Sequence, residues 1–304
     1  MVVIPETFAR DIILYHGEDG ERWMSHLPAI LAACEERWKI TIGAPFANLS
    51  YHYVTSATRA DGSPVVVKAS APTDEFQQES EALRLFGGRG MVELLARDDA
   101  SEVMLLEALQ PGTLLASIED DGLATSIAAS VMRQFWRPVP ADHPFPTVAD
   151  WGRGFSRLRE HYDGGCGPFP PRLLEQAETL FADLCASMDA PVLLHGDLHH
   201  DNILAGQRLP WLAIDPKGLV GEPAYETGAL LRNPLTGLLQ MPQPARILAR
   251  RIDQLAEESG LDRARIRGWG LAQAVLSAWW NVEDEGAIGS EALLCAELLA
   301  SLVL

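Results

Sequence analysis

The strongest constraint on the fold is a change of sequence pattern at Gln110-Pro111-Gly112. Before this point, short runs of β-branched and aromatic residues alternate with turns, and after it apolar residues recur mostly at helical spacing. Proline and glycine commonly end regular structure, so the tripeptide predicts a hinge. A chain of 304 residues is long enough for two lobes with a core each. We therefore expect an α+β protein with an N-terminal lobe at residues 1–109 and a larger, mainly helical lobe at residues 110–304.

The N-terminal lobe is predicted to join a helical appendage over residues 1–38 to a small antiparallel sheet over residues 40–109. Apolar residues recur in the first segment at roughly helical spacing: Trp23, Leu27, Ile30, Leu31 and Trp38. β-forming residues predict strands at 51–55, 65–67, 91–96 and 102–107, with an Asp61-Gly62 turn between the first two. A helix over residues 74–86 is predicted between the second and third strands, because Gly87-Gly88 stops an amphipathic run there.

The C-terminal lobe is predicted to be a series of helices. Their ranges are 123–136, 148–162, 171–188, 244–259, 262–282 and 290–303. One short β-like region, at residues 191–215, interrupts the series. Polar groups crowd into this region between apolar flanks, so they need partners or a function.

The charge balance limits the partners. With 24 Lys and Arg against 42 Asp and Glu, the formal net charge is −18. This charge opposes nucleic acid and anionic lipid and favours a cationic or polar small molecule, although it also serves solubility. The N-terminus does not resemble a signal peptide, no apolar run approaches about 18 residues, and no CxxC pair occurs. We expect a soluble, cytoplasmic protein without nucleic-acid or membrane partners.

The densest polar cluster has the composition of a phosphoryl-transfer site. Its residues are His195-Gly196-Asp197-Leu198-His199-His200-Asp201-Asn202, and Asp215 follows thirteen positions after the last of them. Phosphoryl transfer from ATP needs a carboxylate to accept the proton of the attacking hydroxyl and further oxygen ligands for Mg²⁺. An Asp followed five positions later by an Asn, with an Asp downstream, is the order found in kinases.

A second pair of residues fits the same chemistry. The apolar run Val65-Val66-Val67 leads into Lys68, and Glu79 lies in the predicted helix that follows. Kinases place such a lysine on a strand of the N-terminal sheet, where it contacts phosphates and pairs with a helical glutamate. Neither Lys68 nor Glu79 alone indicates a kinase. Together, and in this order before the Asp197 cluster, they do.

This combination resembles the aminoglycoside phosphotransferase superfamily of kinase-like enzymes, specifically its branch of streptomycin 6-kinases and hydroxyurea phosphotransferases. The cluster from His195 to Asn202 resembles the catalytic loop of the superfamily. Similarity to the branch comes from further segments: Trp136-Arg137-Pro138, residues 143–147 with Asp150-Trp151, residues 214–218, residues 221–226 and residues 231–234. The resemblance implies a protein-kinase-like, two-lobed fold in which residues 40–109 form the nucleotide lobe.

The resemblance also implies roles for individual residues. Asp197 would be the catalytic base, and Asn202 and Asp215 would hold Mg²⁺. ATP would be bound by Lys68 with Glu79 at the phosphates and by Glu107 to Leu109 at the adenine. Residues 43–50 contain one glycine and lack a GxGxxG loop, so Ser50 is either a phosphate contact or a turn residue.

The acceptor is predicted from charge as well as from the resemblance. Aminoglycosides are polycations, which suits an acidic protein. We predict Glu283 and Asp284 as contacts for a cationic substrate, with Trp279 and Trp280 in the core. Streptomycin is the favoured acceptor. Hydroxyurea, or a metabolic sugar or amino alcohol, is the alternative, because the fold does not fix the substrate.

Two other classes of protein compete with this interpretation. A metal-dependent hydrolase could use the cluster from His195 to His200, although that would leave Lys68 and Asp215 unexplained. A non-catalytic kinase-like module would normally have lost the base or a metal ligand. We expect the histidines of the loop to hold backbone in place, and Glu226 to anchor the helical lobe outside the active site.

Overall fold

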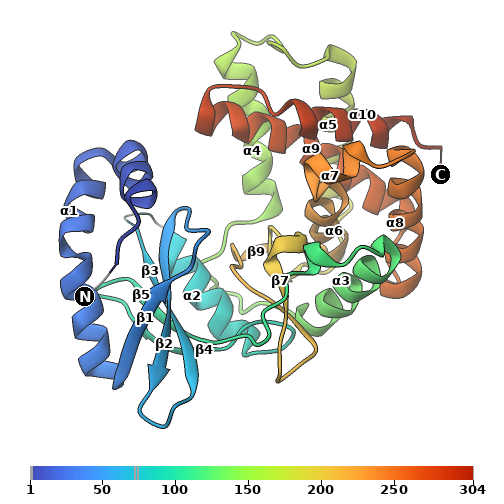
Figure 1. Cartoon of the computed structure of the whole chain (residues 1–304). Helices are drawn as coiled ribbons and strands as arrows, with labels where there is room; N and C mark the ends of the chain where they lie inside the picture. Colours follow the sequence, from blue (N-terminus) through green and yellow to red (C-terminus); the bar gives the residue numbers. More distant parts are fainter. Residues whose placement is uncertain (1–2, 72, 74, 304) are drawn as a thin grey trace. The chain divides into compact units, whose positions relative to one another are not determined.

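The computed structural model describes residues 3–71, 73 and 75–303. The chain separates into two compact units, residues 1–112 and residues 113–304 (Figure 1). The first unit contains the sheet and two helices, and the second is mainly helical. Each unit has an interior of its own, as an α+β architecture requires.

The first unit is built on a five-stranded antiparallel sheet. Its strands are β1 Ile40–Pro45, β2 His52–Arg59, β3 Pro64–Ser70, β4 Leu94–Asp98 and β5 Val103–Glu107. Their order across the sheet is β1-β2-β3-β5-β4. The predicted hairpin is present, because Gly62 takes a φ of +86° and the Asp61 carboxylate accepts a hydrogen bond from the backbone N–H of Ser63 at 2.9 Å.

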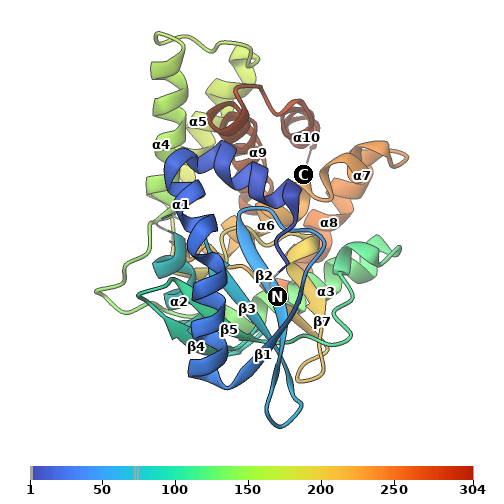
Figure 2. The ribbon, with the colours of Figure 1, turned by 60° about the vertical axis from the view of Figure 1, so that its left-hand side comes forward.

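The helical N-terminal segment is confirmed as α1, Glu6–Trp38, which lies along the sheet (Figure 2). The helix bends at Gly17, whose φ and ψ of 56° and −131° are outside the helical region. Helix and sheet share one apolar cluster, whose buried helical members are Phe8, Ile12, Leu27, Leu31 and Cys34. The appendage therefore supplies part of the core of the first unit.

The helix between the strands is α2, Glu75–Phe86. Asp74, where the sequence predicted its start, lies outside the described residues. The predicted strand at 91–96 is shifted in the structure to β4, Leu94–Asp98. Met91 and Val92 are buried in the core rather than extending that strand, and the Asp98 carboxylate accepts the N–H of Ala100 where the strand ends.

The second unit contains eight helices of six or more residues among the described residues. They are α3 Asp121–Phe135, α4 Val148–His161, α5 Pro171–Ala186, α6 Pro223–Arg232, α7 Leu235–Gln240, α8 Pro244–Ser259, α9 Arg263–Glu285 and α10 Ser290–Ser301. Side chains cap several of them: Asp120 begins α3, Thr147 and Asp150 form a capping box on α4, and Asp262 begins α9. Among the described residues, no helix has both the length and the apolar character to cross a membrane.

The predicted β-like region forms two short antiparallel pairs. Strand β6, Val192–Leu194, pairs with β9, Leu219–Gly221, and β7, Ile203–Ala205, pairs with β8, Trp211–Ala213. Two short 3-10 helices, Leu115–Ser117 and His200–Asn202, complete the elements of this unit. The segment from His195 to Asn202 connects the two sheets, so both of its ends are fixed by strands.

Candidate active site

A tight turn leads from β6 into the segment from His195 to Asn202, the candidate catalytic loop. Gly196 has a φ of +91°, which is unfavourable for residues with a side chain. A Cβ added at this glycine would lie 3.3 Å from the ring of Trp151 and from the side chains of Lys217 and Leu219. The loop therefore needs glycine at this position both for the backbone and for the packing.

Hydrogen bonds join this loop to the segment that carries Asp215. The backbone N–H of Lys217 donates to the carbonyl of His195 at 2.8 Å, and the N–H of Ile214 donates to the carbonyl of Asn202 at 2.9 Å. The Asn202 amide donates to the carbonyl of Asp197 at 3.0 Å. Asp197, Asn202 and the segment of Asp215 are thus held within one hydrogen-bonded framework.

His195 stabilises this framework. Its Nδ1 accepts the N–H of Asp197 at 3.2 Å, so its Nε2 carries the proton and donates to the carbonyl of Ile214 at 2.6 Å. Burial lowers the pKa of His195 to about 4, which keeps the ring neutral. Both ring nitrogens are occupied by backbone, as expected of a structural histidine.

The other two histidines of the loop have different environments. His199 caps the 3-10 helix by accepting the N–H of Asp201 at 3.2 Å, and its Nε2 lies 3.7 Å from Oδ2 of Asp197. His200 is 3% exposed, and burial lowers its pKa to about 3. Within the described ranges, no three His, Cys, Asp or Glu side chains gather as ligands for a metal ion.

Glu226 fixes the backbone of the loop from beneath. Its Oε2 accepts the N–H of His195 at 2.6 Å and its Oε1 accepts the N–H of Gly196 at 3.0 Å. Burial raises the pKa of Glu226 to about 8, although bonds from the backbone oppose the rise. These bonds are consistent with the structural role expected for Glu226. The part of the helical lobe that Glu226 supports is the start of the candidate catalytic loop.

The side chain of Asp197 remains accessible. About a third of it is exposed, and its Oδ1 lies 3.3 Å from Nη2 of Arg232. The sequence analysis included Arg232 only within residues 231–234, a segment that resembles the branch, and gave it no role in the site. The signal was an arginine at the end of an apolar stretch, Ala229-Leu230-Leu231, where a buried charge needs a partner.

The two residues expected to bind Mg²⁺ offer oxygen atoms. Asp215 is exposed and holds a φ of +58°, an uncommon value for a residue with a side chain. Asn202 is half-buried, with its amide nitrogen directed to backbone. A carboxylate and an amide oxygen are ligands of the kind that Mg²⁺ prefers, so the donor set fits this ion.

The predicted lysine and glutamate meet in the first unit. Nζ of Lys68 lies 2.7 Å and 2.8 Å from the two carboxylate oxygens of Glu79. Both side chains are less than a tenth exposed, and they join the middle of β3 to α2. An ion pair this buried holds the lysine ammonium in a defined position.

The other predicted nucleotide contacts lie elsewhere in that unit. Ser50 is exposed in the turn between β1 and β2, and Gly43 lies within β1 against the side chain of Ser56. Glu107 ends β5, where its Oε2 accepts the N–H of Glu93 at 3.2 Å. Leu109 follows and is half-buried. Ser50 lies two residues before β2, whose first residue, His52, pairs with Ser70 of β3, two residues beyond Lys68.

The predicted acceptor contacts lie in the last turns of α9. Glu283 forms a two-pronged pair with Arg157 of α4, at 2.6 Å and 3.0 Å, and Asp284 is exposed. Trp279 is in the core as predicted, at 2% exposure. Trp280 was also predicted in the core but is only half-buried, and its ring packs edge-on against Trp151 with centroids 5.5 Å apart.

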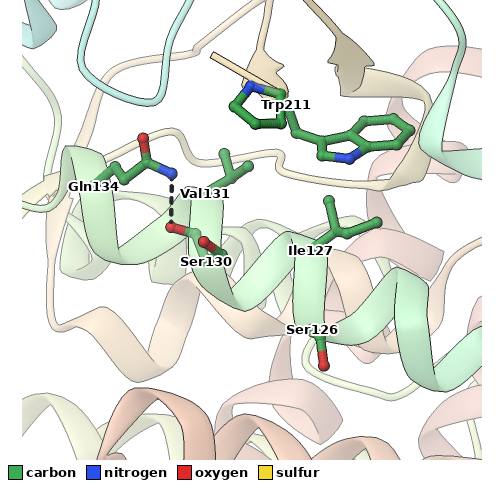
Figure 3. A pocket seen from close by; sticks show the side chains of 7 residues that line it. Ser126, Ile127, Ser130, Val131, Gln134 and Trp211 are labelled. Atoms are coloured by element: carbon green, nitrogen blue, oxygen red, sulfur yellow. Dashed lines mark hydrogen bonds between the residues drawn. The ribbon is translucent and has the colours of Figure 1, made fainter.

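A separate pocket of about 210 Å³ lies in the second unit between α3 and the start of β8 (Figure 3). Its lining residues carry no ionisable side chain: Ser126, Ile127, Ser130, Val131, Gln134, Pro210 and Trp211. Of the predicted catalytic and binding residues, none is part of this lining. Asp197, Asn202 and the segment of Asp215 are joined by hydrogen bonds at the loop from His195 to Asn202 instead.

Comparisons with known proteins bear on the family and the fold of this chain. The profile of the family described as aminoglycoside/hydroxyurea antibiotic resistance kinase matches residues 37–285. A streptomycin 6-kinase of Streptomyces glaucescens is 33% identical over 94% of this chain and 93% of its own. A hydroxyurea phosphotransferase of Kitasatospora aureofaciens is 32% identical over 98% of this chain and 86% of its own. Among solved structures, aminoglycoside phosphotransferase APH(4)-Ia with ADP and hygromycin B shares the fold, with a TM-score of 0.61 at 16% identity, covering 89% and 96% of the two chains.

Proposed function

The chain belongs to the aminoglycoside/hydroxyurea antibiotic resistance kinase family. We propose that it transfers the γ-phosphoryl group of ATP to a hydroxyl of streptomycin, as a streptomycin 6-phosphotransferase. The observation that carries the proposal is the accessible Asp197 carboxylate on a loop fixed to Asn202 and to the segment of Asp215. The two relatives named above bear on the choice of acceptor, and their identities of 33% and 32% favour neither.

Asp197 has the position and the chemistry of a base for an alcohol acceptor. An accessible carboxylate can accept a hydrogen bond from the acceptor hydroxyl, orient its oxygen and take its proton. The loop is fixed by Glu226 and His195, so this carboxylate is oriented before the substrate arrives. Such positioning supplies much of the catalysis in phosphoryl transfer.

Asn202 and Asp215 would hold Mg²⁺, which, when bound, neutralises charge on the phosphates. Lys68, paired with Glu79, would contact the phosphates from the first unit. Loss of that glutamate would leave the ammonium buried without its partner. We place this reaction in the cytoplasm, where ATP is available.

A cationic acceptor is supported by the surroundings of Asp197. Gly196 packs on Trp151, Trp151 packs on Trp280, and Glu283 follows one turn later in α9. Aromatic faces and carboxylates together attract guanidinium and ammonium groups. Arg157 already pairs with Glu283, so a cationic substrate would have to compete with this arginine.

Hydroxyurea, or a metabolic sugar or amino alcohol, remains the alternative acceptor. A neutral acceptor would gain little from the net charge of −18. Family membership makes the protein a phosphotransferase, and the ring nitrogens of His195 are taken up by backbone. The hydrolase alternative is therefore no longer needed.

The proposal is tested by measuring ADP release by the purified protein with MgATP and each of four acceptor classes: streptomycin, other aminoglycosides, hydroxyurea and simple sugars. Asp197→Asn is the control, because the product must depend on the base. Turnover on streptomycin that the variant abolishes supports the proposal, and the site of phosphorylation is then read by NMR of the product. Turnover confined to hydroxyurea or to a sugar would replace the proposed acceptor.

A further inference from the structure

The catalytic carboxylate is contacted by an arginine from outside its own loop. Arg232, the last residue of α6, is 8% exposed as a whole. Its Nη2 lies 3.3 Å from Oδ1 of Asp197, and its Nη1 donates to Oε1 of Gln273 in α9. The guanidinium is thus held between two partners on different elements.

The packing of α6 on α9 fixes the position of Gln273, the second partner of Arg232. Gly228, one turn earlier in α6, lies against Gln273, and a Cβ at this glycine would collide with the glutamine amide. Gln273 is itself 1% exposed, so it has little freedom to turn away. The close packing of α6 on α9 therefore directs the amide oxygen of Gln273 to the guanidinium of Arg232.

The C-terminal end of α6 is anchored independently. Arg251 of α8, which is fully buried, donates through Nη1 to the carbonyls of Leu230, Leu231 and Asn233. It also pairs with Asp121 of α3. The backbone on both sides of Arg232 is therefore fixed, and so is the origin of its side chain.

We propose that Arg232 is a positioning residue, which holds Oδ1 of Asp197 so that Oδ2 is presented to the acceptor hydroxyl. The planar guanidinium supplies donors in a fixed fork, one toward Gln273 and one toward the base. A carboxylate held by one oxygen loses rotational freedom about its χ2 bond, so its other oxygen points in one direction. This inference rests on Asp197 being the base of the proposed function, and it is independent of which acceptor the enzyme uses.

The test is a comparison of kcat and KM for Arg232→Lys and Arg232→Ala with streptomycin as acceptor. Misplacing the base is expected to lower kcat about 10–100-fold, with the KM for MgATP unchanged. The lysine variant keeps the charge and loses the fork, so it is expected to recover only part of the rate. Added guanidinium chloride, at concentrations that leave the protein folded, is expected to raise the kcat of Arg232→Ala and not that of Asp197→Asn.

Three results would overturn the inference. The first is an unchanged kcat in Arg232→Ala. The second is a loss of rate that comes from a higher KM for MgATP. The third is a loss of kcat that guanidinium does not restore in the folded variant. The second of these would make Arg232 a phosphate contact instead. Arg159→Ala is the matched control, because it removes another paired arginine of the second unit, bound to Glu178, without touching Asp197.

Gln273→Met keeps the inference testable if Arg232→Ala does not fold. It removes the second partner of the guanidinium and leaves the arginine in place, so a several-fold fall in kcat with unchanged KM for MgATP is expected. If the wild-type protein does not phosphorylate streptomycin, the proposed acceptor is wrong. The role of Arg232 is then measured with hydroxyurea as acceptor and by ATP hydrolysis in the absence of an acceptor. An equal rate of wild type and variants in those assays would refute the positioning role alone.

Discussion

At the scale of single residues, several buried side chains around Asp197 hold it in place and are not proposed to react themselves. His195 and Glu226 bond the backbone on either side of the turn, and Arg232 contacts the carboxylate itself. Each of these three residues is less than a tenth exposed. Buried polar groups of this kind are costly unless their bonds are complete, so they hold the loop in one conformation.

Asp197→Asn is expected to lower kcat by about 10²–10⁴-fold, because the amide cannot take up the proton of the acceptor hydroxyl. The affinity for ATP should be unchanged, since in the proposed function Lys68, Asn202 and Asp215, rather than Asp197, hold the phosphates and their Mg²⁺. Steady-state kinetics and nucleotide titration of the same preparation measure both quantities. A variant that retains its kcat would show that Asp197 is not the base.

His195→Gln is expected to reduce the loss of stability in acid. An unfolded histidine takes up a proton near pH 6.5, whereas the native His195 stays neutral down to about pH 4. The unfolded state binds more protons in this interval, so the free energy of unfolding falls as the pH drops from 6.5 to 4, by about 3 kcal/mol from this group. Urea unfolding at a series of pH values measures the slope. The exposed His26 provides the control, since His26→Gln should retain the wild-type slope.

The local order of residues predicted one polar region, because Asp197 and Asn202 lie five positions apart and Asp215 follows the short apolar segment that forms β8. The catalytic role of this region stays a prediction. The contact of Arg232 with Asp197 spans 35 positions and exists only after α6 has packed on α9. The pairing of Glu283 with Arg157 spans 126 positions and was equally invisible. Contacts of this range depend on the tertiary fold, which residue spacing does not encode.

At the scale of elements, α6 organises the second unit. Glu222, which directly precedes this helix, accepts bonds from Arg265 and Trp269. Glu226 in its first turn accepts the N–H of His195 in the loop. Residues 224–232 are all buried, so this helix has no polar face. The sequence analysis missed it for that reason, whereas helices with a polar and an apolar face, such as α4 and α8, were predicted close to their true bounds.

Asp121→Asn is expected to destabilise the second unit by about 3–5 kcal/mol, because it removes the carboxylate opposite the fully buried Arg251. The urea midpoint of the purified variant measures the effect. Asp11→Asn is the control, since Asp11 forms an exposed pair with Arg10 whose loss should cost less than about 1 kcal/mol. Similar midpoints for the two variants would mean that the backbone carbonyls alone satisfy Arg251.

At the scale of the whole molecule, the charge of −18 acts on any charged substrate before contact. Salt shortens the range of this field, from about 30 Å at 0.01 M to about 3 Å at 1 M. The field was predictable from composition alone. The division into sheet-containing and helical units was likewise suggested by the change of pattern at Gln110-Pro111-Gly112.

The KM for streptomycin, at saturating MgATP, is expected to rise several-fold between low and high NaCl concentration, because screening weakens attraction of a polycation to an acidic protein. The KM for hydroxyurea, which is neutral, should stay constant over the same range. Initial rates at a series of salt concentrations measure both. A KM for streptomycin that is independent of salt would contradict electrostatic recruitment of the acceptor.

The two ends of α9 have different roles in the proposed function, and this has a consequence for evolution. Its first half holds α6 through Trp269 and Gln273, whereas its last turns carry Glu283 and Asp284, the residues we propose as contacts for the acceptor. Substitutions near the end of this one helix can change which molecule is recognised and leave the supports of the base untouched. A lineage built on this scaffold can therefore acquire a new acceptor by small steps without passing through inactive ancestors.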